Sequence, residues 1–134
     1  MKVFVDSPLL IYLNTVAEPG ARAQYESFYL DLLSRYSPYT DVLVLDELIY
    51  VSRTKYGVPY SVTLDFVESI VLPYVRVLSL GEEEYRQAAR LLPEYNVEPS
   101  DALHLAVALN NGIGLVVSED RDFDRVPLVR RVWL

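Results

Sequence analysis

The sequence predicts a three-layer α/β/α fold whose central sheet is mostly parallel and has roughly five strands. Short apolar segments alternate with longer segments of helical periodicity, which is typical of a parallel sheet covered by helices on both faces. The segment GLVVS (114–118) is apolar throughout rather than alternating, as expected of a strand buried on both sides. No repeat, linker or low-complexity tract divides the chain, so residues 1–134 are predicted to form one domain.

The first half of the chain contains two predicted strands and two predicted helices. KVFVD (2–6) is a short β-branched and apolar run that ends in an acid. Within 20–36, aromatic residues and leucines recur at spacings of three and four, which indicates a helix. DVLVL (41–45) is predicted to be the second strand. DELIYVSRTKYG (46–57) follows as a helix, with acids in its first turn and a glycine near its end.

Two prolines divide the middle of the chain. Ser61 is predicted to cap a helix that Pro73 ends. VRVLSL (75–80) has the composition of a strand, and a glycine turn follows it. EEEYRQAARLL (82–92) is predicted to be a helix, because acids occupy its first turn and Pro93 closes it.

The last third of the chain supplies a buried helix and two strands. SDALHLAVALNNG begins at Ser100, the predicted N-cap, and ends at Asn111 and Gly112. This helix is apolar on nearly every side, so we expect it to lie inside the protein. GLVVS and RRVWL (130–134) are the last two predicted strands.

Composition limits the chemistry that the chain can perform. The sequence has no cysteine and one histidine, which excludes disulfides and argues against a zinc site. No segment approaches the ~18 apolar residues of a membrane span, and the N-terminus lacks the features of a signal peptide. We therefore expect a cytoplasmic protein with no membrane partner. The net charge of −7 disfavours a nucleic-acid partner unless the acids bind cations.

Several acids are expected to meet at one edge of the sheet. Sites in open parallel sheets form beyond the carboxyl ends of the strands. Asp6 ends the first predicted strand, and Asp120 follows the GLVVS strand by two residues. Glu47 opens a helix directly after the second predicted strand, so it can reach the same edge. Asp101 lies in the first turn of the buried helix, where no strand immediately precedes it.

Carboxylates at such close range require compensation. Two of them ~4 Å apart repel by about 4 kcal/mol at an effective dielectric of 20, and four together approach the total stability of a domain. Either some carboxyl groups stay protonated or a cation lies between them. Because oxygen ligands select hard ions, the sequence predicts an Mg²⁺ or Mn²⁺ site for phosphoryl chemistry.

The segments around these acids resemble a known family. VFVDSPLLIYL, LDELIYV, SDALHLAVAL and VVSEDRDFDRV are similar, in order and separation, to the four acidic blocks of PIN domains, especially the VapC-type toxin ribonucleases. The resemblance implies a PIN-like fold with a flavodoxin-like strand order. It also implies a metal-dependent endoribonuclease that hydrolyses RNA phosphodiester bonds with Mg²⁺ or Mn²⁺, a homodimer, and a separately encoded antitoxin of the VapBC type.

The resemblance also assigns roles, residue by residue. It implies that four acids bind the metal and position the attacking water: Asp6, Glu47, Asp101 and Asp120. Asp122 matches the second acid of the last block and is expected to assist at the metal, while Ser7 and Ser118 match supporting hydroxyls. The family often has asparagine two residues after the first acid. This chain has Pro8 there, so substrate placement near Asp6 is expected to differ.

Other residues have simpler interpretations. Asp46 is interpreted as an N-cap or first-turn acid, and His104 as a structural histidine rather than a general base. The tyrosines, leucines and valines of 9–36 are the expected groove for an antitoxin helix. Two alternative functions stay open: a stand-alone RNA-processing nuclease of the same domain, and a catalytically weak scaffold that binds RNA or protein.

Overall fold

The computed structural model describes residues 1–134 and contains one five-stranded sheet in the order β3-β2-β1-β4-β5. Every neighbouring pair of strands is parallel, which confirms the predicted fold class and makes the sheet parallel throughout. The strands are β1 (Lys2–Val5), β2 (Ser37–Asp41), β3 (Arg76–Leu78), β4 (Leu115–Val117) and β5 (Arg130–Val132).

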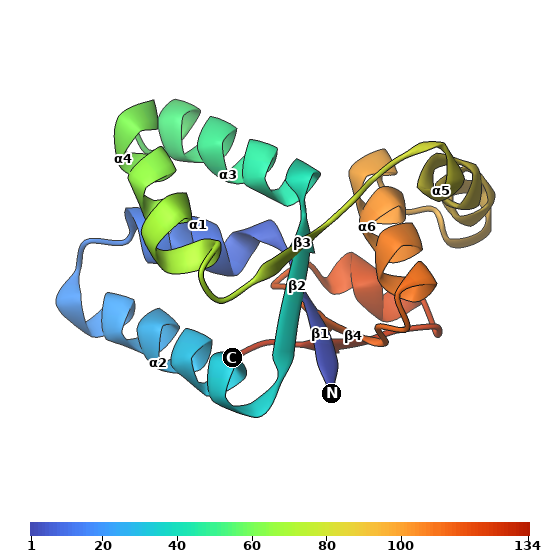
Figure 1. Cartoon of the computed structure of the whole chain (residues 1–134), viewed down its shortest axis with the longest axis horizontal. Helices are drawn as coiled ribbons and strands as arrows, with labels where there is room; N and C mark the ends of the chain where they lie inside the picture. Colours follow the sequence, from blue (N-terminus) through green and yellow to red (C-terminus); the bar gives the residue numbers. More distant parts are fainter.

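Helices cover both faces of the sheet (Figure 1). The first four helices lie on one face, and α5 packs against α6 on the other. The helical segments are α1 (Ser7–Thr15), α2 (Pro19–Arg35), α3 (Val42–Thr54), α4 (Tyr60–Phe66), the π-helix η1 (Val67–Val71), α5 (Glu82–Tyr95), α6 (Pro99–Asn110) and the 3₁₀-helix η2 (Arg121–Arg125). None of these helices combines the length and the apolar character that crossing a membrane requires. The buried apolar side chains of both layers and the sheet form a continuous core.

The direction in which strands are added to the sheet reverses at β1, the middle strand. We expected a flavodoxin-like order, 2-1-3-4-5, and this prediction is wrong, because the observed order is 3-2-1-4-5. The chain adds β2 and β3 on one side of β1 and then crosses over to add β4 and β5 on the other side. Open α/β sheets bind ligands where the winding reverses, at the carboxyl ends of the two central strands. In this protein that position is the carboxyl edge of β1 and β4.

The second strand ends where we expected it to begin. Residues 37–41 form β2, whereas 42–45, predicted as strand, are the first turn of α3. The Asp41 side chain caps this helix by accepting a hydrogen bond from the Val44 amide at 3.0 Å. A short apolar run is compatible with a buried helix as well as with a strand. In this protein Val44 and Leu48 are buried one helical turn apart, which favours the helix.

Smaller differences concern the other helices. The sequence does not predict α1, because its residues are mostly apolar and lack the polar face that marks an amphipathic helix. Helix α5 continues beyond Pro93, which was expected to close it, since a proline in the last turn removes only one hydrogen bond. The N-cap of α4 is Pro59 rather than Ser61, and the N-cap of α6 is Glu98 rather than Ser100.

Candidate metal centre

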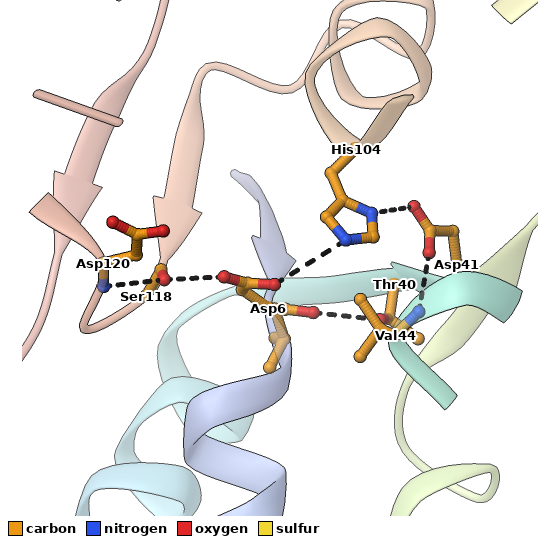
Figure 2. A network of polar contacts seen from close by, with 8 residues as sticks. Asp6, Thr40, Asp41, Val44, His104, Ser118 and Asp120 are labelled. Atoms are coloured by element: carbon orange, nitrogen blue, oxygen red, sulfur yellow. Dashed lines mark hydrogen bonds and ion pairs between the residues drawn. The ribbon is translucent and has the colours of Figure 1, made fainter. Parts of the chain in front are cut away.

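Asp6 lies between β1 and α1, in the middle of the carboxyl edge of the sheet (Figure 2). Its amide donates to the Val117 carbonyl at 3.0 Å, which continues the pairing of β1 with β4. The residue is only 4% exposed. The Ser118 hydroxyl donates to its Oδ2 atom at 2.7 Å. The remaining lone pairs of the carboxylate are available to accept a hydrogen bond or to bind a metal ion.

Hydrogen bonds connect Asp6 to the acids that follow β4. The Ser118 Oγ atom accepts from the Asp120 amide at 3.0 Å. The Asp120 Oδ1 atom in turn accepts from the Asp122 amide at 2.9 Å, so that Asp120 caps η2. The carboxylate of Asp122 itself pairs with Arg125 at 2.5 Å. Ser118 therefore joins Asp6 to the segment that carries Asp120 (Figure 2).

The other two acids come from helices on opposite faces of the sheet. Asp101 lies in the first turn of α6 and is 7% exposed. Glu47 lies in the second turn of α3 rather than in the first, because that helix begins at Val42. Our interpretation of Asp46 as the cap or a first-turn acid of this helix is wrong for the same reason. Asp41 is the N-cap, and Asp46 is exposed to solvent.

The directions of the pKa shifts indicate that Asp6 lies within electrostatic range of Glu47, Asp101 and Asp120. Burial raises the pKa of Asp6, and the charge of Asp120 adds to this, although His104 opposes it. Burial, followed by the charges of Asp6 and Asp120, raises the pKa of Asp101 to about 7. Partial burial and the charge of Asp6 likewise raise the pKa of Glu47. Ionising all four acids together is therefore unfavourable unless a cation joins them.

A histidine and an aspartate complete the site (Figure 2). His104, one turn after Asp101 on α6, is 1% exposed, and its Nδ1 atom lies 2.5 Å from Oδ2 of Asp41. Its Nε2 atom lies 3.8 Å from Oδ1 of Asp6 and has no hydrogen-bond partner. Burial lowers the pKa of His104, but the hydrogen bond and charge of Asp41 and the nearby acids outweigh burial, so that the pKa is raised overall.

The sequence offered only part of this arrangement. An aspartate three residues before Val44, at the start of an apolar helix, is an N-cap pattern that could have identified Asp41. No local pattern indicates that the second oxygen of Asp41 reaches His104, which is 63 positions away along the chain. We call the set that the structure brings together the acidic centre: Asp6, Asp41, Glu47, Asp101, His104 and Asp120.

Three residues of the acidic centre are candidate ligands of one divalent ion, and Glu47 and Asp120 lie outside this group. Asp6, Asp101 and His104 each offer one ligand atom, and these atoms lie within 4.8 Å of one another. Carboxylate oxygen and imidazole nitrogen are both common ligands of divalent metals. The unpartnered Nε2 atom distinguishes this cluster from acids that only share an edge of a sheet, because buried polar atoms normally have partners.

A small cleft adjoins the acidic centre between α1 and α3. Its walls are Ser7, Pro8, Ile11, Tyr12, Glu47, Val51, Lys55, Tyr56 and Glu119. The Tyr12 hydroxyl donates to Glu119 and so links α1 to the segment after β4. A molecule that reaches Glu47 through this cleft meets the ammonium group of Lys55 and two tyrosine rings.

A larger cleft, which we call the apolar cleft, lies between α2 and η1, away from the acidic centre. It has a volume of about 310 Å³ against about 110 Å³ for the small cleft. Its lining is Leu13, Arg22, Glu26, Tyr29, Leu30, Leu33, Phe66, Ile70 and Tyr74. The segment 9–36, in which we expected a groove, supplies most of this lining.

Comparisons with known proteins agree with this fold. Residues 3–128 match the sequence profile of a family described as PIN domain. No curated protein sequence matches the chain. Among solved structures, the chain is similar to VapC20 of Mycobacterium tuberculosis, described as a sarcin–ricin loop cleaving toxin. The TM-score is 0.76 and the identity 19%, over 95% of this chain and 96% of that chain.

Two further structures have a similar fold. One is VapBC2 of Rickettsia felis bound to a fragment of its promoter DNA, with a TM-score of 0.72 and 17% identity over 99% of this chain and 98% of that chain. The other is a toxin–antitoxin complex of Klebsiella pneumoniae, with a TM-score of 0.66 and 16% identity over 96% and 95% of the two chains. At such identities the likeness establishes a shared fold, while function depends on the site.

Proposed function

This chain belongs to the PIN domain family, and on that premise we propose that it is a metal-dependent endoribonuclease, the toxin of a VapBC-type pair. The observation that carries the proposal is the acidic centre, where acids from four separate segments meet at the ligand-binding edge of the sheet. The proposed catalytic and metal-binding residues are Asp6, Glu47, Asp101 and Asp120. Asp122 is proposed to assist, and Ser7 and Ser118 to support them.

The different burial of the acids indicates a different role for each in binding the metal. A bound Mg²⁺ or Mn²⁺ ion supplies an activated water and stabilises charge on the phosphodiester oxygens. Asp6 and Asp101 offer oxygen ligands from the buried end of the centre, whereas Glu47 offers a carboxylate at the exposed end, beside the small cleft. The Ser118 hydroxyl keeps the Asp6 carboxylate in one orientation, so the ligand is preorganised.

We propose that the small cleft admits single-stranded RNA. Lys55 on its wall provides a cation for a phosphate, and the rings of Tyr12 and Tyr56 provide surfaces for bases. The net charge of −7 includes the acids of the centre, and bound cations would neutralise several of them.

We also propose that the apolar cleft binds the antitoxin. Its exposed Leu30 and Ile70 lie beside the charged groups of Arg22 and Glu26, an arrangement that suits an amphipathic helix with apolar anchors. The Klebsiella pneumoniae structure with a similar fold is a toxin–antitoxin complex, which supports a partner of this kind. A homodimer and a cytoplasmic location complete the proposal.

The nuclease is tested by cleavage of a pool of structured RNAs in EDTA, Mg²⁺ or Mn²⁺. We expect cleavage only with metal, and Asp120→Asn should reduce its rate by at least about 100-fold. Asp124→Asn is the matched control, because Asp124 lies in the same segment but is exposed and pairs with Arg131 at 3.0 Å, so activity should persist. Metal binding without cleavage under any condition would contradict the nuclease and favour a scaffold.

The toxin is tested in growing cells. Expression of the chain should arrest growth, Asp120→Asn should abolish the arrest, and co-expression of the protein encoded beside it should relieve the arrest. Metal-dependent cleavage without toxicity, and without binding to that neighbour, would contradict the toxin and favour a stand-alone RNA-processing nuclease.

A further inference from the structure

The Nε2 atom of His104 is the only buried side-chain nitrogen or oxygen of the protein that lacks a hydrogen-bond partner. Native proteins rarely leave such an atom unsatisfied, and the exceptions call for an explanation such as an ion-binding or catalytic role. The atom lies inside the acidic centre, 3.8 Å from Oδ1 of Asp6 (Figure 2). It therefore faces carboxylate oxygens across a gap that no protein atom bridges by a hydrogen bond.

Two contacts determine the orientation of the His104 ring, and a third holds its hydrogen-bond partner in place. Its Nδ1 atom lies 2.5 Å from Oδ2 of Asp41, which is fully buried. The other oxygen of Asp41 accepts from the Val44 amide at 3.0 Å, so the carboxylate is itself held in place. The ring of Phe4 packs against the imidazole, with 5.4 Å between the ring centroids. When Nδ1–H is donated to Asp41, the lone pair of Nε2 is directed toward Asp6.

We propose that His104 binds the divalent ion through Nε2, and that Asp41 is the carboxylate that orients it. This inference rests on the proposed metal-dependent function and adds to it a nitrogen ligand and an ion preference. Ligand atoms about 2.1 Å from one ion lie at most about 4.2 Å apart. The 3.8 Å separation between Nε2 and the Asp6 oxygen satisfies this limit.

The pair of Asp41 and His104 has the arrangement of a carboxylate–histidine–metal triad. In such triads the carboxylate accepts a hydrogen bond from the ring nitrogen that does not bind the metal, which sets the tautomer and strengthens the ligand. A purely structural buried histidine would be expected to use both nitrogens in hydrogen bonds, whereas His104 uses one.

A nitrogen ligand changes which ion the centre prefers. Mg²⁺ is bound almost entirely by oxygen, whereas imidazole favours transition metals, with affinity rising from Mn²⁺ toward Co²⁺. We therefore expect Mn²⁺ and Co²⁺ to bind more tightly than Mg²⁺, and we expect this difference to depend on His104.

The first experiment uses the fact that His104 is the only histidine in the sequence. Untagged protein labelled with ¹⁵N in histidine alone is stripped with EDTA, loaded with one equivalent of Mn²⁺ and measured by pulsed electron paramagnetic resonance. We expect a ¹⁵N coupling to Mn²⁺ that is replaced by a ¹⁴N coupling in unlabelled protein. Bound Mn²⁺ without coupling to histidine nitrogen would overturn the inference yet leave the proposed nuclease intact. Failure to bind Mn²⁺ at all would overturn both.

The second experiment is calorimetric titration of variants with Mn²⁺ and Mg²⁺. His104→Asn places an amide nitrogen near the position of Nδ1, so it retains the donor to Asp41 and removes Nε2. Asp41→Asn retains an acceptor for the Val44 amide but reverses the bond to the ring, which moves the ring proton to Nε2. Both variants should lose about 10- to 100-fold in Mn²⁺ affinity, with a smaller change for Mg²⁺.

The matched control is Thr40→Val. Thr40 precedes Asp41, and its hydroxyl donates a buried hydrogen bond of 2.9 Å to the Val5 carbonyl, so the substitution removes a neighbouring hydrogen bond and leaves the proposed ligands unchanged. Its Mn²⁺ affinity should equal that of the native protein. Equal Mn²⁺ affinity in the native protein and in His104→Asn would overturn the nitrogen ligand. Weaker Mn²⁺ binding in His104→Asn, with a smaller change for Mg²⁺ and native affinity in Thr40→Val, would support the nitrogen ligand.

Discussion

The acidic centre and the apolar cleft lie at the two ends of one helix, α1. The acidic centre buries charged side chains, whereas the apolar cleft exposes apolar ones. Asp6 precedes α1 in a buried site crowded with carboxylates. Leu13, near the other end of α1, lines a cleft in which Leu30 and Ile70 face solvent. Buried charge requires a cation, and exposed apolar surface requires an apolar partner. The acidic centre therefore indicates a cationic ligand, and the apolar cleft indicates an apolar partner.

The two regions also affect stability differently. A buried carboxylate lowers the stability of the folded state when it is ionised. The raised pKa of Asp101 reflects this cost. Exposure of Leu30, which is 64% exposed, costs little, because the unfolded chain exposes the same side chain. Substitutions in the acidic centre should change stability and activity together, whereas substitutions of the exposed side chains of the apolar cleft should change mainly partner binding.

The largest expected effect is on cleavage. Asp6→Asn preserves the shape of the side chain but removes a central carboxylate, so the rate of RNA cleavage should fall by about 1,000-fold. The metal-free variant should be at least as stable as the native protein, because a buried charge is lost. Rates are measured with excess Mn²⁺, and stability by urea unfolding in EDTA. A variant that kept a tenth of the native rate would contradict a catalytic role for Asp6.

The next largest effect is expected on stability. His104→Leu leaves Asp41 fully buried without its partner, so the free energy of unfolding should fall by about 3–5 kcal/mol. His104→Asn is the control, since it retains a donor to Asp41 and should be affected less. Urea unfolding of both variants measures the difference. An equal loss in the two variants would show that packing, and not the buried pair, accounts for the effect.

The third prediction concerns pH. The pKa of Asp101 is 3.8 in the unfolded chain and about 7 in the folded protein, so the folded state binds more protons between these values. Stability in EDTA should therefore fall as pH rises through this window, by up to about 4 kcal/mol. The raised pKa of His104 acts in the same direction above its ordinary value of 6.5, because stability present below that pH is lost as the folded group deprotonates.

Thermal unfolding between pH 5 and 8 measures this dependence. Asp101→Asn should make the stability less dependent on pH, and it should raise the stability of the metal-free protein at pH 8. Mn²⁺ should also make the stability less dependent on pH, because the ion favours the ionised carboxylates. Stability that rises with pH in EDTA would mean that the acids are not crowded as this structure shows.

The smallest effect on stability is expected in the apolar cleft. Leu30→Glu should change the free energy of unfolding by less than about 0.5 kcal/mol, because Leu30 is mostly exposed. Leu32→Ala, two positions along the same helix, should cost about 2–4 kcal/mol, because Leu32 is 2% exposed. Leu30→Glu should nevertheless weaken binding of the neighbouring antitoxin. Unchanged binding would exclude this cleft as its site.

Local pattern was sufficient for the architecture. The alternation of apolar strands with helices predicted a parallel sheet between two helical layers, because strand and helix periodicities are properties of short segments. The same reasoning failed for 41–45, where an apolar β-branched run is compatible with both structures and the Asp41 cap decides for the helix. Strand order also could not be derived locally, because it depends on the side of β1 to which each later strand is added.

By itself, the sequence predicted four acids for the site, Asp6, Glu47, Asp101 and Asp120, because each of them stands in a segment that resembles one of the family's acidic blocks. Only the tertiary structure decided what Asp41 and His104 do. They are 63 positions apart, and their hydrogen bond joins residues of α6 and β2 across the edge of the sheet. Whether a histidine is structural or ligating depends on what its second nitrogen faces, and that is a property of three-dimensional proximity that no local periodicity encodes.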